Sequence, residues 1–378
     1  MLTSLKAPAQ EAGGNVSSGG VEFHAVSKTF PDGTQALDAI SLHCPAGETT
    51  VFVGPSGCGK TTALRMINKM VLPSRGHVTV NGVDVASMAT MELRRQIGYV
   101  IQNAGLFPHK RVIDNVALIP RLLGEAKSTA RDRAAELLKL VGLPVELGRK
   151  YPHQLSGGQQ QRVGVARALA ADPPILLMDE PFSAVDPIVR RDLQNHLKGL
   201  QGELRKTIIM VTHDLDEAVF LADQVVVFRP GAVAQVDSPG SILTAPADDY
   251  VEGFTKGNAG IKWLSLLPTE GLLLEPVSSD AGAETRAASG WVLQNDDDGR
   301  PESWIQAGTP GATGGQGPIP VRSPFVYGVD TLNSALNSAV LSPAGKAVAV
   351  DSHGRTRGLV DAREIHAAVR IAKGNDND

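Results

Sequence analysis

The stretch Gly54-Pro55-Ser56-Gly57-Cys58-Gly59-Lys60-Thr61 decides the fold of this chain. It fits the pattern G-x-x-x-x-G-K-[ST], in which small residues let backbone N–H groups approach a phosphate chain closely. The segment Thr49–Val53 before it predicts a buried strand, and Thr62–Asn68 after it predicts a helix. A helix that starts at this loop directs partial positive charge at the phosphates.

Two side chains of this loop are predicted to act on a nucleoside triphosphate. Lys60 is expected to reach the β- and γ-phosphates, and the Thr61 hydroxyl to hold Mg²⁺. A glycine-rich turn before a helix is the alternative interpretation of the loop taken alone. The predicted strand before it and the helix after it favour the phosphate site.

A second segment, Ile175–Met178 followed by Asp179 and Glu180, predicts the other half of a triphosphate site. A short apolar run after two prolines is typical of a central parallel strand. Asp179 is expected to hold Mg²⁺ through its water shell, and Glu180 to orient and polarise an attacking water. The alternative is a helix N-cap, which Pro181 disfavours because the residue before proline avoids helical backbone angles.

A third segment, Leu155-Ser156-Gly157-Gly158-Gln159, predicts a second phosphate cradle. Ser156 is the expected N-cap of a helix through Gln160–Ala171, and the glycines leave backbone N–H groups exposed. One loop already serves one nucleotide, so a second cradle at a helix N-terminus needs a ligand of its own.

With these three motifs, the first two-thirds of the chain resembles the ATP-binding cassette (ABC) ATPases. The resemblance implies an α/β fold of the P-loop NTPase type, with a mixed-sheet core and a helical subdomain. It implies ATP and Mg²⁺ as cofactors. It also implies a homodimer, in which Ser156, Gly157, Gly158 and Gln159 of one subunit bind the γ-phosphate of ATP held by the other.

The resemblance assigns roles to residues that carry little signal by themselves. Gln102, after the predicted strand Gly98–Ile101, matches a catalytic glutamine that contacts Mg²⁺ or its water. His213, after Ile208–Thr212, matches a catalytic histidine that contacts the γ-phosphate. A lone histidine also suits a helix start, but its place between a strand and a helix favours the catalytic role. The other implied nucleotide contacts are Phe30, which stacks on adenine, Thr62 at the α-phosphate, and Asp186, which crosses the dimer interface.

Composition divides the chain into three parts. Residues 1–20 are predicted to be a flexible leader, and 21–256 the ABC ATPase domain with its helical subdomain at about 103–160. Residues 257–378 are richer in aspartate, glycine and proline, and the Gly/Pro-rich stretch 308–318 is typical of a flexible linker.

The last part resembles a degenerate pair of cystathionine-β-synthase-type (CBS) repeats at about 261–307 and 319–373. The second copy is predicted as a helix at 331–336, strands at 346–351 and 356–360, and a helix at 362–371. Such pairs often bind adenine nucleotides. Here Asp361 and Glu364 stand where the family has a hydroxyl residue and an aspartate, and the extra negative charge would repel a phosphate. A nucleotide or ionic-strength effector and a purely structural dimerisation role both stay open.

Segments around Gln102 make the resemblance more specific. Residues 98–109, 112–117 and 120–124 resemble the ATPases of glycine betaine, carnitine, choline and proline importers. This implies the ATP-hydrolysing subunit of an importer of a quaternary-ammonium or betaine-type osmoprotectant, at the cytoplasmic face of a bacterial membrane. Its partners would be transmembrane permease subunits and, indirectly, an extracytoplasmic substrate-binding protein. An importer ATPase for an amino acid or polyamine, and a non-transport ABC ATPase, stay as alternatives.

Composition excludes other classes. The 378 residues are 42% hydrophobic and 20% charged, and the net charge of −4 implies no strong attraction to nucleic acid. The 2 cysteines lack metal-like or redox spacing. No apolar run is long enough to span a bilayer, and the first twenty residues lack the apolar core of a signal peptide. A CBS-type sensor with a residual cassette is disfavoured because every catalytic position is filled.

Overall fold

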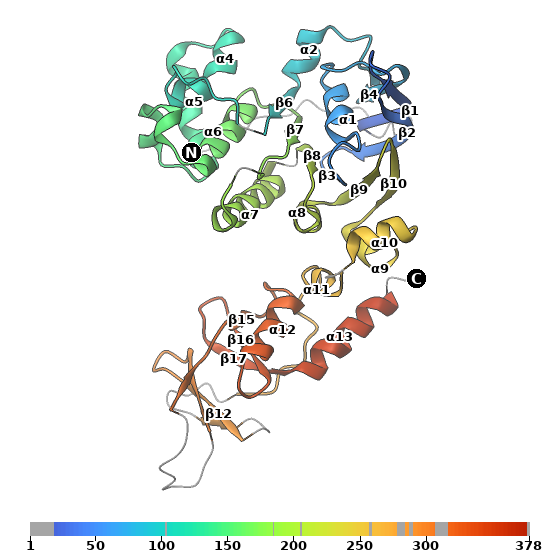
Figure 1. Ribbon diagram of the computed structural model, residues 1–378. Helices are drawn as coiled ribbons and strands as arrows, with labels where there is room; N and C mark the ends of the chain where they lie inside the picture. Colours follow the sequence, from blue (N-terminus) through green and yellow to red (C-terminus); the bar gives the residue numbers. More distant parts are fainter. Residues whose placement is uncertain are drawn as a thin grey trace, which may run out of the picture. The chain divides into compact units, whose positions relative to one another are not determined.

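The computed structural model describes residues 19–102, 104–183, 185–204, 206–256, 259–277, 284–286, 290–306 and 317–375. Contacts divide the chain into two units, Met1–Pro239 and Gly240–Asp378 (Figure 1). The division falls earlier than the boundary predicted from composition. Nearly all of the predicted leader and most of the predicted linker at 308–318 lie outside the described residues.

A six-stranded sheet in the order β10-β9-β3-β8-β7-β6 forms the centre of the first unit. Its strands are parallel except β10, which pairs antiparallel with β9. Strands β3, β7 and β8 are buried along their whole length, as a parallel sheet covered on both faces requires. The bounds are β3 (Thr49–Val53), β6 (Ile97–Val100), β7 (Ile175–Asp179), β8 (Thr207–Thr212), β9 (Gln224–Arg229) and β10 (Ala232–Asp237).

A second, antiparallel sheet in the order β2-β1-β4-β5 belongs to the same unit. Phe23 of this sheet packs edge-on against Phe52 of β3, and both join a core with Leu64 of helix α1 (Lys60–Ile67). The strands of this sheet are β1 (Gly20–Thr29), β2 (Gln35–Pro45), β4 (Arg75–Val80) and β5 (Val83–Asp84).

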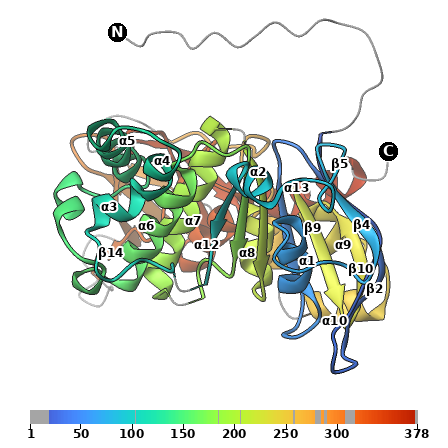
Figure 2. The ribbon, with the colours of Figure 1, turned by 90° about the horizontal axis from the view of Figure 1, so that it is seen from above.

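Helices between β6 and β7 form a subdomain with its own core, grouped to one side of the sheets in Figure 2. Val112, Leu138 and Val163 are fully buried in that core. The subdomain contains α3 (Val112–Val116), α4 (Leu118–Leu122), α5 (Lys127–Leu140), two 3-10 helices (Val145–Arg149 and Pro152–Gln154) and α6 (Gly157–Leu169). Around it, α2 (Thr90–Arg95) precedes β6, α7 (Pro187–Leu204) follows β7, and α8 (Leu215–Leu221) follows β8.

The second unit contains two small sheets. One has the order β15-β16-β17, with β15 and β16 parallel, and the other is the antiparallel sheet β11-β12-β13-β14. The helix, strand, strand and helix predicted over 331–371 are confirmed. The bounds are α9 (Pro239–Thr244), α10 (Asp249–Thr255), α11 (Ala259–Leu264), β11 (Glu284–Arg286), β12 (Trp291–Asn295), β13 (Pro301–Gln306), β14 (Ile319–Pro320), β15 (Phe325–Val326), α12 (Leu332–Leu341), β16 (Lys346–Val350), β17 (Thr356–Asp361) and α13 (Ala362–Asn375).

The proposed first CBS copy differs from the second in its secondary structure. After α11, its described residues form the strands β11, β12 and β13 in an antiparallel meander. Leu293 and Trp304 of this meander pack on Val348 and Leu359 of β16 and β17. The tandem CBS assignment stays a prediction. In the described part of the chain, no helix combines the length and apolar character that crossing a bilayer requires.

Candidate functional site

The loop between β3 and α1 depends on glycine at its two ends. Gly54 has φ +151°, and a Cβ there would lie 2.5 Å from the carbonyl oxygen of Phe228. Gly59 has φ +108°, and its Cβ would lie 2.5 Å from the carbonyl oxygen of Ala36. Gly57, at φ +80°, faces open space. The strand, loop and helix predicted around the motif are therefore present, with the backbone freedom that a phosphate cradle needs.

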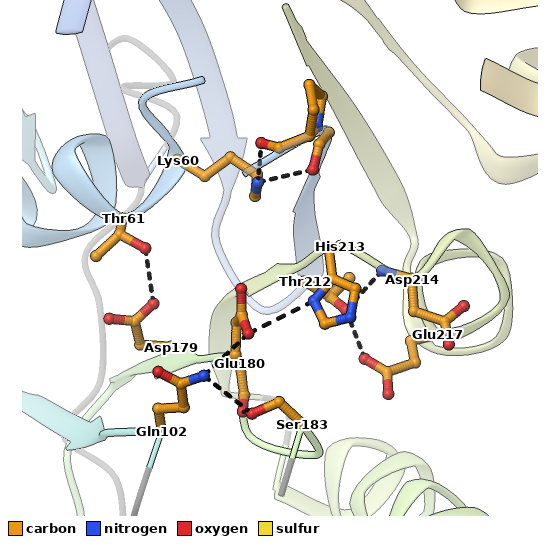
Figure 3. A network of polar contacts seen from close by, with 12 residues as sticks. Lys60, Thr61, Gln102, Asp179, Glu180, Ser183, Thr212, His213, Asp214 and Glu217 are labelled. Atoms are coloured by element: carbon orange, nitrogen blue, oxygen red, sulfur yellow. Dashed lines mark hydrogen bonds and ion pairs between the residues drawn. The ribbon is translucent and has the colours of Figure 1, made fainter. Parts of the chain in front are cut away.

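Lys60 crosses this loop from the first turn of α1. Its side chain is buried, and Nζ donates hydrogen bonds to the carbonyl oxygens of Gly54 at 2.7 Å and Pro55 at 2.8 Å (Figure 3). Cys58 is buried beside it, with Sγ 3.7 Å from Nζ, as a small filling residue. A phosphate oxygen would be a stronger partner for this ammonium group than a neutral carbonyl oxygen.

Thr61 and Asp179 meet at the end of β7. The Thr61 hydroxyl donates to Asp179 Oδ1 at 2.9 Å (Figure 3), and Asp179 is 6% exposed. Hydroxyl and carboxylate oxygens are ligands that Mg²⁺ takes, so the residues present fit this ion. Two residues that sequence reasoning missed complete the surroundings: Arg65 Nη2 and Tyr99 Oη lie 3.3 and 3.4 Å from Asp179 Oδ2. Burial raises the pKa of Tyr99, so its hydroxyl keeps its proton.

Glu180 lies where Gln102 and His213 converge. Its Oε2 accepts a hydrogen bond from Gln102 Nε2 at 3.2 Å and lies 3.5 Å from His213 Nδ1 (Figure 3). Its backbone has φ +46°, and its N–H donates to the carbonyl oxygen of Val211 on β8. Ser183 accepts a second hydrogen bond from Gln102 at 3.3 Å. All three sequence-predicted catalytic side chains therefore share one cluster at the carboxyl ends of neighbouring strands.

The 155–159 motif begins α6 as predicted. Ser156 is the N-cap: its Oγ accepts from the N–H of Gln159, and Gln159 Oε1 accepts from the N–H of Ser156. This capping box leaves Ser156 and Gly157 exposed, while Gly158 is buried. Among the described residues, no hydrogen bond links the motif to the phosphate-binding loop of the same chain.

The remaining predicted contacts lie around the loop. Phe30 follows β1 and is half-buried, with Lys28 Nζ 5.2 Å from its ring centroid. Thr62 is half-buried in the first turn of α1. Asp186 is exposed just before α7, and its backbone carbonyl accepts the N–H of Arg190. These positions do not test whether the three residues contact nucleotide, so those contacts stay predictions.

The site therefore combines three features. A loop with glycine near both ends lies beside the pair formed by Thr61 and the buried Asp179, and the Glu180 carboxylate lies between the Gln102 amide and the His213 imidazole. On a mainly parallel sheet with the loop between a strand and a helix, these features define a P-loop nucleoside-triphosphate-binding protein. Within the described residues, no separate group of three or more His, Cys, Asp or Glu side chains is arranged to bind a metal ion.

Comparisons with known proteins narrow the class. The family described as ABC transporter matches residues 37–183. The osmoprotectant import ATP-binding protein OsmV of Salmonella typhimurium is 44% identical over 265 residues, which are 70% of this chain and 69% of the relative. The glycine betaine uptake system ATP-binding protein YehX of Escherichia coli is 46% identical over 247 residues, 65% of this chain and 80% of the relative. The chain therefore belongs to the ABC transporter ATP-binding proteins.

Other matches cover a smaller share of the chain. The choline transport ATP-binding protein OpuBA of Bacillus subtilis is 52% identical over 229 residues, 61% of this chain and 60% of the relative. The chain thus spans less than two-thirds of the length of that relative. The solved dimeric, post-hydrolysis state of an ATP-binding cassette with ADP and Pi has a TM-score of 0.54 and 34% identity. It covers 58% of this chain and 98% of that cassette.

Proposed function

We propose that this protein is the ATP-hydrolysing subunit of an ABC importer that energises uptake of a quaternary-ammonium or betaine-type osmoprotectant. Relatives named for choline, glycine betaine and osmoprotectant import support the substrate class. The ATPase acts with separate transmembrane permease subunits at the cytoplasmic face of the membrane. An extracytoplasmic substrate-binding protein delivers the solute to the permease.

The position of Glu180 is the observation that best supports the proposed ATPase activity. Its carboxylate is oriented by Gln102 and lies within reach of His213 at the end of β7. A carboxylate held in this way can orient and polarise a water for attack on the γ-phosphate. Lys60 would exchange its two carbonyl partners for phosphate oxygens, and the imidazole of His213 would bind the γ-phosphate.

The Thr61–Asp179 pair is the proposed Mg²⁺ site. Bound there, the ion would neutralise charge that develops on the phosphates during transfer. Thr61 would bind it directly, and Asp179 through the water shell. Arg65 and Tyr99 hold Asp179 Oδ2, which keeps Oδ1 directed at the Thr61 hydroxyl.

The exposed N-terminus of α6 supports a site shared between two copies of the chain. Ser156 and Gly157 present a helix start that lacks a hydrogen bond to the chain's own phosphate loop in the described residues. Anions favour such helix starts. In the proposed homodimer, Ser156, Gly157, Gly158 and Gln159 would contact the ATP held by Lys60 and Thr61 of the partner.

A groove between the core and the helical subdomain is the proposed docking site for the permease. Its volume is about 510 Å³, and apolar side chains such as Phe107, Ile119 and Leu122 line it together with Arg94 and Arg95. Phe107 and Leu122 are exposed large hydrophobic residues. This chemistry suits a short permease helix with apolar and acidic side chains.

Hydrolysis and transport are tested separately. The purified chain is expected to hydrolyse MgATP, and Glu180→Gln to lower kcat by about 10²-fold or more while ATP still binds and a dimer accumulates. Glu136, exposed on α5, supplies the control, and Glu136→Gln should leave kcat unchanged. Near-normal turnover in the Glu180→Gln protein would exclude Glu180 as the base.

The transport function is tested in cells that lack the gene. Radiolabelled glycine betaine, choline and carnitine uptake should fall and return with the wild-type gene, but remain low with Glu180→Gln. A tagged chain should copurify with a permease from membranes. Normal uptake of all three solutes alongside loss of amino-acid or polyamine uptake would overturn the substrate class, and recovery without any permease would favour a non-transport ATPase.

A further inference from the structure

One buried carboxylate anchors the segment that carries His213. Thr212 Oγ1 donates to Glu217 Oε2 at 2.6 Å and accepts the N–H of Asp214 at 3.0 Å (Figure 3). The hydrogen bond between Thr212 and Asp214 thus joins the two residues on either side of His213. Glu217, in the first turn of α8, is 4% exposed. Burial raises the pKa of Glu217, and the Thr212 hydroxyl opposes that rise.

A single guanidinium connects this segment to the one that precedes α7. Arg190 Nη1 lies 3.8 Å from Asp214 Oδ2, and its Nε lies 3.9 Å from Glu217 Oε1. Its Nη2 donates to the carbonyl oxygen of Val185 at 3.3 Å. Val185 immediately precedes Asp186, the residue expected at the dimer interface. Arg190 therefore contacts both the histidine segment and the segment that would face a second subunit.

We infer that Thr212, Glu217 and Arg190 are positioning residues that hold the His213 imidazole beside Glu180 and tie it to the segment at Val185. The inference rests on the proposed ATPase function. Catalytic groups lose rate steeply when they are displaced by about 1 Å, so a freed histidine segment should slow turnover without weakening ATP binding equally. Closure of a dimer on Asp186 would reach His213 through Arg190.

The first test compares variants of the full-length chain in steady-state MgATP hydrolysis. Thr212→Val keeps the branched shape but removes the hydroxyl, and is expected to lower kcat about tenfold with KM changed less than about twofold. Thr212→Ser keeps the hydroxyl and should return most of the rate. Arg190→Gln should lower kcat by several-fold. Arg191→Gln is the control on the same helix. It removes a neighbouring guanidinium that packs on the Phe220 ring, 3.9 Å from the ring centroid, and leaves the Arg190 contacts in place.

The second test separates positioning from general stability. If Thr212 acts through His213, Thr212→Val should have little further effect on kcat in a His213→Ala background. Full additivity of the two effects, or a wild-type kcat in Thr212→Val, would overturn the inference. If Thr212→Val does not fold, the same cycle with Arg190→Gln decides. Absence of MgATP hydrolysis in the wild-type chain would instead contradict the proposed function.

Discussion

The Glu180 carboxylate lies 3.5 Å from the imidazole Nδ1 of His213, at the ends of two neighbouring parallel strands. Glu180 reaches this position through a left-handed backbone angle, φ +46°, which its N–H hydrogen bond to Val211 of β8 supports. The histidine is 58% exposed at its side chain, and the glutamate 24%. The His213 side chain is therefore accessible to a ligand, whereas the backbone of Glu180 is held by its hydrogen bond to β8.

Removal of the imidazole should mainly affect turnover. His213→Ala is expected to lower kcat of ATP hydrolysis by about 10²-fold, because the imidazole that is proposed to contact the γ-phosphate is lost. KM for ATP should change much less, since the phosphate loop is intact. His77→Ala is the matched control because His77 is exposed on β4. Equal kcat values for the wild-type and His213→Ala proteins would rule out a catalytic His213.

Loss of charge at Asp179 should change the metal requirement. Asp179→Asn keeps the shape but removes the carboxylate that accepts from Thr61, Arg65 and Tyr99. The Mg²⁺ concentration for half-maximal hydrolysis should rise by about 10- to 100-fold. Mg²⁺ titrations of ATPase activity at fixed ATP measure it. Tyr99→Phe serves as the milder comparison, and an unchanged Mg²⁺ midpoint in Asp179→Asn would exclude the proposed metal site.

The sequence predicted the strand–loop–helix unit because its signals are local. Thr49–Val53 is a short segment rich in β-branched residues, and the glycine pattern follows it directly. The contacts of Arg65 and Tyr99 with Asp179 were not predictable in this way, because they join residues 114 and 80 positions apart. The Tyr99 contact depends on the pairing of β6 with β7, which puts Tyr99 beside Asp179. Arg65 did carry one signal: it lies one turn after Thr61 on the same helix face.

The backbone angle of Glu180 and the long-range ion pairs could likewise not be predicted from the sequence. Pro181 indicated that Glu180 is not helical, but the left-handed angle depends on the hydrogen bond to Val211 in another strand. The Arg190 contacts with Asp214 and Glu217 join two helices that no pattern connects. In the second unit, the sequence predicted the strands β16 and β17, while the packing of Leu293 and Trp304 on them is a tertiary result.

Two glycines of the phosphate loop should respond differently to a methyl group. Gly54→Ala would put Cβ 2.5 Å from a backbone oxygen at φ +151°, so it should lower the free energy of unfolding by about 3 kcal/mol. Gly57→Ala meets open space at φ +80° and should cost about 1 kcal/mol. Denaturant unfolding of the two proteins measures both values. Equal stabilities would show that the Gly54 backbone can move away.

Cys44 should make stability fall at alkaline pH. Burial raises the pKa of this fully buried thiol to about 12, from the ordinary value of 9.0 for a cysteine. Between these values the folded chain holds the proton and the unfolded chain releases it, so rising pH favours unfolding. The contribution reaches at most about 1.4 kcal/mol per pH unit. Denaturant unfolding between pH 8 and pH 10.5 should show a shallower decline for Cys44→Ala than for wild type, and parallel curves would contradict the burial effect.

The second unit contains a charged pair whose removal should destabilise it without touching the ATP site. Lys346 is 7% exposed at its side chain and binds the carboxylate of Glu275, which is 51% exposed. Glu275→Gln leaves a buried ammonium group without its counter-charge, at a cost of about 1 to 3 kcal/mol once exposure of the glutamate is taken into account. Lys346→Met in the Glu275→Gln background should recover much of this loss, because a methionine needs no counter-charge. Thermal unfolding followed together with ATPase activity tests the prediction. An equal loss in the single and double variants would mean that Glu275 acts through some contact other than Lys346.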